Sequence, residues 1–345
     1  MLPYDALEAL ARERLPQAVF DYYAGGSGEE STLADNTAAW ARLRLRPRIL
    51  RDVSSVDTST ELLGVKLAAP VLVAPTAFHS LAYPEAELAT ARGTREAGSL
   101  LVLSSRASRR IEDVAALAGP WWFQVYVFRD RGLTRALVQR AVAAGARALV
   151  LTGDTPYVGR KRRNRGDSAL PLPDEELLVN LEGLTHRSLA EQAPDTSFAD
   201  LDRLREDSGL PVLVKGVLRA DDARECLHHG AAGLIVSNHG GRQLDGALAT
   251  AEALPEVVEA TGGRVPVLVD GGVRSGGDVL RALALGARAV LLGRPVLWGL
   301  ATGGADGVRQ VLDSLREDTA HALALAGAPD LSRVGADLLA PPRRP

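Results

Sequence analysis

Eight short apolar runs recur along the chain, and segments with the pattern of amphipathic helices separate them. The runs are rich in Val, Leu and Ile, and they lie at residues 70–75, 100–104, 121–127, 146–152, 211–215, 233–237, 265–270 and 289–293. A continuously apolar strand has to be covered on both faces, as parallel strands are in α/β proteins. Eight alternating units therefore predict an α/β fold of the closed (β/α)8 type, a TIM barrel.

The segments between the runs carry spaced Leu, Ala and Val among charged residues, as amphipathic helices do. Such segments lie at 84–97, 111–118, 133–144, 221–229 and 275–285. Asp221, Asp222 and Ser275 stand where helix N-caps are expected. Four glycines that follow helical segments are expected to act as C-terminal stops, namely Gly98, Gly145, Gly230 and Gly286.

The pattern predicts one domain over residues 1–345, in which the barrel has two additions. A helical extension at residues 1–65, which begins with a helix at 4–15, precedes a barrel at 66–330. A segment at 156–208 follows the fourth run and is longer than a usual βα connection. Long loops of barrels are commonly lids or functional appendages, so this segment is expected to contribute to a site.

Composition excludes several classes of partner. The net charge of -3 and the pI near 6.1 provide no field that would gather nucleic acid, although a basic island lies at 160–163. The N-terminus lacks the pattern of a signal peptide, and no apolar window is long enough to span a bilayer. Cys226 is the single cysteine and lies in a helical pattern, so a buried, inert thiol in a reducing compartment is expected. We expect a cytoplasmic protein with neither a nucleic-acid nor a membrane partner, and no metal site.

Polar residues follow the predicted strands. Barrel enzymes place their sites where strands emerge at the C-terminal face, so these residues are expected to lie together. Strand terminators alone would be mainly Gly, Pro, Asn and Asp, whereas hydroxyls, an amide, a lysine, a histidine and arginines occur here. The set comprises Thr76, Ser104, Gln124, Tyr126, Thr152, Asp154, Lys215, Ser237, His239, Arg242, Asp270, Gly271, Gly272, Arg274, Gly293 and Arg294.

Two groups within this set indicate a chemistry. His239 follows Ser237 at the end of the sixth run, and Arg242 comes three residues later, which places a base beside an anion-binding fork. The expected substrate is an anion with a removable proton. Glycine–arginine pairs after the last two runs match the phosphate site common in such barrels, so a phosphorylated ligand is also expected.

The chain resembles the family of FMN-dependent α-hydroxy-acid oxidases and dehydrogenases, which includes glycolate and lactate oxidases. The resemblance covers nearly the whole chain. It rests on the motifs SNHGGRQLD (237–245), VDGGVR (269–274), LVKG (213–216), APTA (74–77), QVY (124–126), DTP (154–156) and DYY (21–23). It implies the barrel fold, an FMN cofactor and assembly as a homotetramer or homo-octamer.

The resemblance also implies roles for residues at the substrate. His239 corresponds to the base, and Asp154 to the carboxylate that orients it. Arg242 corresponds to the arginine that holds the substrate carboxylate by a two-pronged contact, which a lysine could not copy. Tyr22 and Tyr126 correspond to tyrosines whose hydroxyls face the substrate, although each alone would more often be a packing aromatic.

A second set of roles implied by the resemblance concerns the flavin. Lys215 would lie near the N1 and O2 edge of the ring, where a fixed positive charge stabilises the anionic reduced form. Asp270 would bind a ribityl hydroxyl. The residues along the N5 side of the ring would be Ala74, Pro75, Thr76 and Ala77. Hydrogen bonds to ring or ribityl groups would come from Ser104, Gln124, Thr152 and Ser237. The residues near the phosphate would be Gly271, Gly272, Arg274, Gly293 and Arg294.

The activity implied is oxidation of a 2-hydroxy acid to a 2-oxo acid, with two electrons passing to FMN and O2 then giving hydrogen peroxide. Whether the base takes the carbon proton or the hydroxyl proton stays open. Two alternatives are a specialised FMN oxidoreductase for a biosynthetic or peptide-derived substrate and a dehydrogenase with an acceptor other than O2. A scaffold without catalysis conflicts with the presence of His239, Asp154, Arg242 and Lys215 together.

The chain departs from the family pattern near the substrate. Lys161 stands where relatives commonly have a second arginine, which would weaken a two-pronged contact by about 1–2 kcal/mol unless Arg160 or Arg162 takes the place. Arg106 stands where relatives have tryptophan or a smaller apolar residue. It either points into the substrate pocket or is a solvated loop residue.

Two further expectations concern the surroundings of the pocket. The segment after the fourth run lacks an apolar stretch, which favours an oxidase over a membrane-coupled, quinone-reducing enzyme. His79 is close to the flavin side by its position in the chain, and a surface or packing role is favoured over a place in the pocket.

Overall fold

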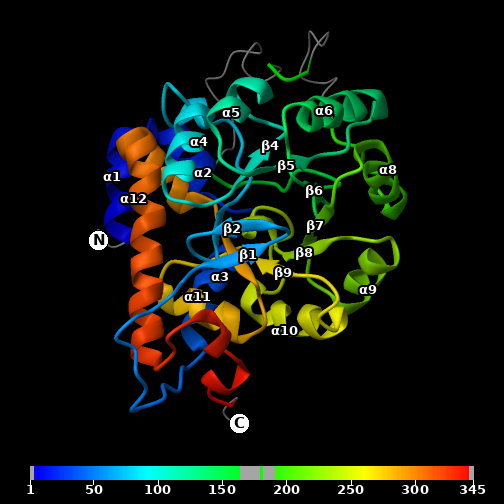
Figure 1. Ribbon diagram of the computed structural model, residues 1–345. Helices are drawn as coiled ribbons and strands as arrows, with labels where there is room; N and C mark the ends of the chain where they lie inside the picture. Colours follow the sequence, from blue (N-terminus) through cyan, green and yellow to red (C-terminus); the bar gives the residue numbers. More distant parts are fainter. Residues whose placement is uncertain (1–3, 164–178, 182–190, 342–345) are drawn as a thin grey trace.

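The computed structural model describes residues 4–163, 179–181 and 191–341, and a closed barrel of eight parallel strands forms their centre. The strands are joined in the order β10-β3-β4-β5-β6-β7-β8-β9 (Figure 1). They are β3 (Val71–Val73), β4 (Leu101–Ser104), β5 (Trp121–Val125), β6 (Leu149–Thr152), β7 (Val212–Val217), β8 (Gly233–Val236), β9 (Val267–Val269) and β10 (Ala289–Leu292). The predicted TIM barrel is confirmed.

Each predicted run overlaps one of these strands, and the differences lie at the ends. The run at 70–75 yields only Val71–Val73, since Pro70 and Pro75 have no N–H to donate to a neighbouring strand. The strand predicted at 211–215 continues to Val217, with an irregular register between Lys215 and Val217. Both faces of the strands are buried, as their continuous apolar pattern requires.

Within the described residues, a helix follows each barrel strand and covers the outside of the barrel in Figure 1. These helices are α4 (Glu87–Glu96), α5 (Ile111–Leu117), α6 (Arg131–Ala143), α8 (Phe198–Ser208), α9 (Ala220–His228), α10 (Thr250–Thr261), α11 (Gly276–Ala284) and α12 (Arg294–Ala326). The fourth, α8, occupies the end of the segment predicted as a long loop at 156–208. Residues 164–178 and 182–190 of that segment lie outside the described residues.

The predicted helix ends are mostly confirmed. Ser275 forms a capping box with Asp278 at the start of α11. The N-cap of α9 is Arg219 rather than Asp221 or Asp222, which lie in the first turn, where a carboxylate favours the positive end of the helix dipole. The predicted stops all have left-handed backbone, with φ of 65° at Gly98, 90° at Gly145, 71° at Gly230 and 100° at Gly286.

The N-terminal extension contains more than helices. Helices α1 (Tyr4–Arg14), α2 (Gln17–Ala24) and α3 (Ser31–Arg42) confirm its helical part. The sequence did not predict the antiparallel hairpin of β1 (Thr60–Leu62) and β2 (Val65–Leu67). Its buried Leu62, Val65 and Leu67 share one apolar cluster with inward residues of the barrel such as Leu72 and Trp122. The hairpin therefore closes the barrel interior at the end opposite the polar strand termini.

Helix α12 crosses the outside of the barrel and packs beside α1 and α4 (Figure 1). It is kinked at Gly303 and Gly304, whose backbone is not helical. Its N-terminus starts directly after β10, so Gly293 and Arg294 stay at the polar end of the barrel. Three-residue turns of 3-10 helix lie at η1 (His79–Leu81), η3 (His239–Gly241), η4 (Leu331–Arg333) and η5 (Ala336–Leu338).

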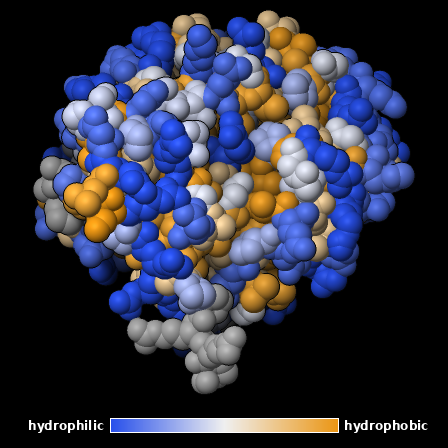
Figure 2. All heavy atoms as spheres, turned by 60° about the horizontal axis from the view of Figure 1, so that its bottom comes forward, coloured by the Kyte–Doolittle hydropathy of each residue, from blue (hydrophilic) through white to orange (hydrophobic). Residues whose placement is uncertain are grey.

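No helix in the described part of the chain has both the length and the apolar character needed to cross a bilayer. The face in Figure 2 is largely hydrophilic, with smaller apolar patches between charged residues. Cys226 lies in α9 and confirms the predicted burial of this thiol. Burial raises the pKa of the thiol to about 12, which disfavours the reactive thiolate.

Candidate active site

A cavity of about 340 Å³ opens where the barrel strands end. Part of its wall consists of residues that follow the strands, because the carboxyl ends of parallel strands meet at one end of the barrel. Residues of helix α2 also line it. The predicted site residues that line it are Tyr22, Ala74, Pro75, Thr76, Ala77, Ser104, Arg106, Tyr126, Lys161, Lys215, His239, Arg242, Asp270, Gly271, Gly272, Arg274, Gly293 and Arg294.

The other predicted site residues lie one layer behind this wall. Asp154 forms a hydrogen bond with His239, and Ser237 forms one with Lys215. Gln124 forms a hydrogen bond with Ser104. Thr152 accepts a hydrogen bond from Gln124 at 2.9 Å. The structure thus brings all predicted site residues together, and these four support lining residues rather than lining the cavity.

His239 is held by a carboxylate. Its Nδ1 lies 3.0 Å from Oδ1 of Asp154. Burial alone would raise the pKa of Asp154, but its interactions with His239 and Lys215 lower this pKa below its ordinary value. An ionised Asp154 accepts a hydrogen bond from Nδ1–H, and we assign this tautomer because it leaves Nε2 as a base.

The backbone also directs this histidine. His239 has a left-handed φ of 58°, which is unusual for a residue with a side chain. Its N–H donates to Oγ of Ser237 at 3.0 Å. Such backbone strain persists where the surrounding structure enforces it, often at a functional site.

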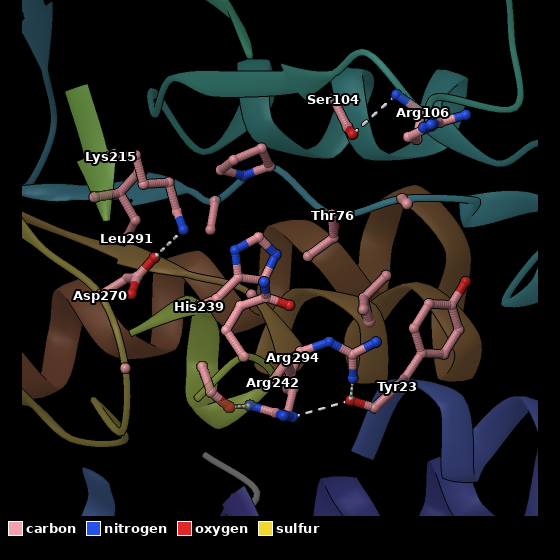
Figure 3. Close-up of a pocket in the computed structure, with 18 of the residues that line it drawn as sticks. Tyr23, Thr76, Ser104, Arg106, Lys215, His239, Arg242, Asp270, Leu291 and Arg294 are labelled. Carbon is pink, nitrogen blue, oxygen red and sulfur yellow. Dashed lines mark hydrogen bonds and ion pairs between the residues drawn. The ribbon is translucent and has the colours of Figure 1, made fainter. Parts of the chain in front are cut away.

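Lys215 lies at one side of the cavity, next to Asp270 (Figure 3). Its Nζ donates to Oγ of Ser237 at 2.8 Å and forms an ion pair with Oδ2 of Asp270 at 3.3 Å. Burial would lower the pKa of Lys215, but Asp270 and Asp154 raise it, so the ammonium group stays charged. Oδ1 of Asp270 is buried and has no hydrogen-bond partner within the described residues, so it is available to a donor on a ligand.

A chain of uncharged polar groups crosses strands β4, β5 and β6. Oγ of Ser104 donates to Oε1 of Gln124 at 3.2 Å, and Nε2 of Gln124 donates to Oγ1 of Thr152 at 2.9 Å. All three side chains are buried. This side of the barrel end is therefore polar without net charge.

Arg242 and Arg294 hold the C-terminus of helix α2. Arg242 donates to the carbonyls of Tyr22 at 2.7 Å and Gly25 at 2.8 Å. Arg294 donates to the carbonyls of Tyr23 at 3.0 Å and Gly25 at 3.1 Å. Figure 3 shows both guanidinium groups directed at the Tyr23 carbonyl. Cations favour the negative end of a helix dipole, so this contact fastens α2 over the barrel.

Positive charge predominates in the cavity. Asp270 is the one acidic residue among the described lining residues, against the cations Arg106, Lys161, Lys215, Arg242, Arg274 and Arg294. Burial and repulsion by Arg242 and Arg274 lower the pKa of Arg294 to about 9. Burial and repulsion by Arg242 and Arg294 lower the pKa of Lys161 to about 7. A cavity with this field is suited to anionic ligands.

Helix α3 fixes the glycine turn after β9. Gly271 and Gly272 both have left-handed backbone, with φ of 90° and 83°. A Cβ on Gly272 would lie 2.1 Å from the carbonyl oxygen of Asn36. The amides of Asn36 and Asn238 exchange two hydrogen bonds of 2.9 and 2.7 Å, and Nε1 of Trp40 donates to the Gly271 carbonyl at 2.8 Å. The turn can be this close to α3 only because it has no side chain.

The substrate candidates Tyr22, Lys161 and Arg242 lie together. Nζ of Lys161 is 5.3 Å and Cζ of Arg242 is 5.1 Å from the centre of the Tyr22 ring, within the range of cation–π contact. Of residues 160–162, Lys161 is the one that lines the cavity among the described residues. Burial raises the pKa of Tyr22 and of Tyr126, so both hydroxyls stay protonated and able to donate.

Arg106 also lies on the cavity wall, partly buried. Its guanidinium lies 5.2 Å from the centre of the Phe128 ring, and burial lowers its pKa. The structure therefore places Arg106 against an aromatic residue at the cavity rather than in solvent.

The basic island at 160–163 joins the N-terminal extension to the barrel. Arg162 forms an ion pair with Glu29, and Arg163 forms one with Glu30. The N–H of Gly28 donates to the Arg160 carbonyl at 3.0 Å. Acidic residues of the N-terminal extension thus match the charges of Arg162 and Arg163, which gives this part of the island a structural role.

Two residues of the stretch 237–245 have roles that the sequence did not indicate. Nε2 of Gln243 donates to the carbonyls of Asp154 at 2.9 Å and Tyr157 at 2.7 Å. Asp245 accepts from the N–H groups of Glu29 at 2.8 Å and Thr32 at 3.0 Å. Both tie separate segments to the loop that bears His239. The position of Gln243 and Asp245 in that loop was the feature of the sequence that could have indicated these roles. Their partners are far away in the sequence, so the contacts themselves could not be predicted.

Comparison with known proteins agrees with this geometry. The chain matches the family model of FMN-dependent dehydrogenases over residues 11–341. It is 45% identical to the L-lactate oxidase of Nostoc sp. over 96% of both chains, and 44% identical to the glycolate oxidase of Spinacia oleracea over 95% of this chain and 92% of that one. The crystal structure of mandelate oxidase with (S)-4-hydroxymandelic acid has a TM-score of 0.93 at 43% identity, with 99% of this chain and 98% of that chain covered.

The chain belongs to the FMN-dependent dehydrogenase family. The groups in the cavity fit FMN, since the start of helix α12 at Arg294 and the cation Arg274 suit a phosphate. The unpartnered Oδ1 of Asp270 suits a ribityl hydroxyl, and the charged Lys215 suits an electron-rich ring.

The glycine turn generates a prediction for cofactor binding. We expect Gly272→Ala to weaken FMN binding at least tenfold, because the new Cβ would displace the Asn36 backbone and with it the turn. A fluorescence titration of the apoprotein with FMN measures the effect. Gly262→Ala is the matched control, since Gly262 is also left-handed, with φ of 56°, but a Cβ there meets no atom within 4 Å. Equal affinities of the two variants would contradict the role of the turn.

Proposed function

We propose that this protein oxidises a 2-hydroxy acid to the 2-oxo acid with FMN, and that O2 reoxidises the flavin to give hydrogen peroxide. The observation that carries the proposal is the pairing of His239 with Asp154 in a cavity that also contains Arg242 and the FMN-suited groups. Related L-lactate, glycolate and mandelate oxidases are named for substrates of this class.

Each residue at the substrate end would act through a group already described. Arg242 and Lys161 would neutralise the carboxylate, and Tyr22 and Tyr126 would donate hydroxyl hydrogen bonds to it or to the 2-hydroxyl. Nε2 of His239 would take a proton from the substrate, and the ionised Asp154 would stabilise the imidazolium that results. Bound FMN would accept the two electrons.

The proposed cofactor contacts divide by place on the wall. Lys215 would stabilise negative charge on the ring, and Asp270 would bind a ribityl hydroxyl. Ala74, Pro75, Thr76 and Ala77 would border the ring, while Gly271, Gly272, Arg274, Gly293 and Arg294 would surround the phosphate. Ser104 would bond the flavin directly, and Gln124, Thr152 and Ser237 would orient the groups in contact with it.

Arg106 favours a second candidate function. A guanidinium on the cavity wall suits a 2-hydroxy acid that carries a polar or anionic group at its far end. The alternative is therefore an FMN oxidoreductase for a larger biosynthetic or peptide-derived 2-hydroxy acid. A dehydrogenase that passes electrons to an acceptor other than O2 is the alternative at the oxidative step.

We also propose a single domain, a cytoplasmic location and a homotetramer or homo-octamer. The shared core of the N-terminal hairpin and the barrel supports the single domain. The use of one cysteine, the buried Cys226, supports a reducing compartment. The exposed Ile49, Leu50 and Leu325 support burial of surface between subunits.

Anaerobic titration of the FMN-loaded protein with L-lactate, glycolate and (S)-mandelate tests the function. We expect at least one acid to bleach the visible flavin absorbance, and admitted O2 to restore it with hydrogen peroxide equimolar to the 2-oxo acid. Bleaching without reoxidation by O2 would support the dehydrogenase. A flavin that none of the three acids reduces would favour the second candidate.

His239→Asn identifies the base in the same assay. We expect it to bind FMN normally and to slow flavin reduction by about 10²–10⁴-fold, the usual contribution of general base catalysis. His321→Asn is the matched control, because His321 is exposed on α12, away from the cavity, and its rate should not change. A His239→Asn variant with an unchanged rate would exclude this residue as the base.

Lys161 generates a prediction for pH dependence. Its pKa is lowered to about 7, so the side chain is cationic below that pH and neutral above it. We expect KM for a 2-hydroxy acid to rise by up to about tenfold as the pH increases above 7, since the carboxylate loses one cationic partner. Steady-state kinetics from pH 6 to 9 measure this rise.

Two variants separate the effect of Lys161 on KM from the effects of other residues at the substrate end. Lys161→Arg keeps its charge and should hold KM nearly constant, whereas Lys161→Met should have the high KM at every pH. The same rise of KM in all three proteins would contradict the role of Lys161.

A further inference from the structure

A buried hydrogen-bonded chain lies behind the cavity wall and reaches it at Thr76. Oγ1 of Thr76 is 2.6 Å from Nε2 of His79, and Nδ1 of His79 is 2.8 Å from Oγ1 of Thr90 on helix α4. Thr76 lines the cavity and lies near its centre in Figure 3, whereas His79 does not line it. The predicted packing position of His79 is thus confirmed, with one contact to a residue that faces the cofactor.

The His79 ring is neutral. Only 2% of the residue is exposed, and burial lowers its pKa although Glu87 and Thr76 oppose the shift. A neutral imidazole has one N–H donor and one nitrogen acceptor. The two threonine hydroxyls must therefore receive opposite roles from the ring.

The surroundings of Thr90 decide which nitrogen carries the hydrogen. Oγ1 of Thr90 is fully buried, and its hydrogen-bond partner within the described residues is Nδ1 of His79. A buried hydroxyl hydrogen requires an acceptor, so Thr90 donates to Nδ1. The ring hydrogen is then on Nε2 and points at Oγ1 of Thr76. The hydroxyl hydrogen of Thr76 then has no acceptor among the described residues, and it can donate to a ligand in the cavity that Thr76 lines.

We propose that His79 is a positioning residue that fixes the Thr76 hydroxyl as a hydrogen-bond donor to an acceptor atom of the flavin ring. The inference rests on the proposed function only in that FMN occupies the cavity. A donor directed at the ring stabilises the electron-rich reduced flavin more than the oxidised one. His79 thereby raises the tendency of the bound flavin to accept electrons, without touching it.

The backbone around His79 is held without help from its ring. Oε1 of Glu87 accepts from the N–H of His79 at 3.1 Å and from that of Ser108 at 2.9 Å. The hydroxyl of Tyr23 donates to the Phe78 carbonyl at 2.5 Å. A change of the His79 ring should therefore leave the loop after β3 in place and alter mainly the Thr76 hydroxyl.

The midpoint potential of bound FMN, measured by equilibration with redox dyes, tests this inference. We expect Thr76→Val to shift the equilibrium about tenfold toward oxidised flavin, which is about 30 mV for a two-electron couple. His79→Leu should shift it about threefold in the same direction. In the double variant the shift should equal that of Thr76→Val alone, because His79 acts only through Thr76. Additive shifts, or no shift in His79→Leu, would overturn the proposal.

Two control variants distinguish the loss of the Thr76–His79 contact from a general loss of packing. Thr76→Ser keeps the hydroxyl and should retain the wild-type potential; a shift as large as that of Thr76→Val would overturn the proposal. Thr94→Val removes another buried hydroxyl of α4, whose hydrogen-bond partner within the described residues is the Thr90 carbonyl. This variant should leave the potential unchanged. A shift equal to that of His79→Leu would assign the effect to helix packing and overturn it as well.

The dye measurement needs no 2-hydroxy acid. If the protein binds FMN but oxidises none of the acids, the proposed function is wrong. The potential of its bound FMN still tests the role of the Thr76–His79 contact.

Discussion

The structure depends on positive charge gathered at one end of the barrel. Arg242, Arg274, Arg294 and Lys161 repel one another in a partly buried cavity, and this repulsion adds to burial in lowering the pKa of Arg294 to about 9 and that of Lys161 to about 7. Backbone carbonyls at the end of α2 offset part of the repulsion. Bound anions would offset the rest, so the phosphate of FMN and the carboxylate of a substrate complete the arrangement electrostatically.

The same charges explain why the N-terminal extension belongs to the site. Helix α2 is fastened by arginines that follow β8 and β10. Helix α3 is fastened to the glycine turn after β9 by Trp40 and to Asn238 after β8 by Asn36. Further contacts join the N-terminal extension to loops of the barrel. Asp245 accepts a hydrogen bond from the N–H of Thr32. Ion pairs join Arg162 to Glu29 and Arg163 to Glu30. The extension thus supplies Tyr22 to a cavity that the barrel alone would leave open on that side.

The sequence predicted what the barrel topology enforces. Parallel strands bring their carboxyl ends together, so the residues after each run met in one cavity as expected. It did not predict which of them line the cavity, because successive side chains of a strand point in opposite directions and a shift of one residue reverses them. Gln124, Thr152 and Ser237 lie behind the wall, where they hydrogen-bond the side chains in front of them or one another.

Other features lacked a local signal. The hairpin of β1 and β2 has only three residues in each strand, too few for a visible alternation. Asn36 and Gln243 act through partners far away in the chain, and so does Tyr23 through Phe78. The contacts of His79 with Thr76 and Thr90 are near in sequence, but only burial shows that the ring is neutral and which hydroxyl it orients.

The central claim is that uncompensated positive charge draws an anionic cofactor into the cavity. Comparison of FMN with riboflavin, which lacks the phosphate, tests it most directly by titration of the apoprotein at low and high salt. Two charge-assisted contacts to a phosphate contribute about 3 kcal/mol, so FMN should bind at least about 100-fold more tightly than riboflavin at low salt. The difference between the affinities for FMN and riboflavin should decrease at high salt, because salt screens the charges. Equal affinities for the two flavins at low salt would contradict the account.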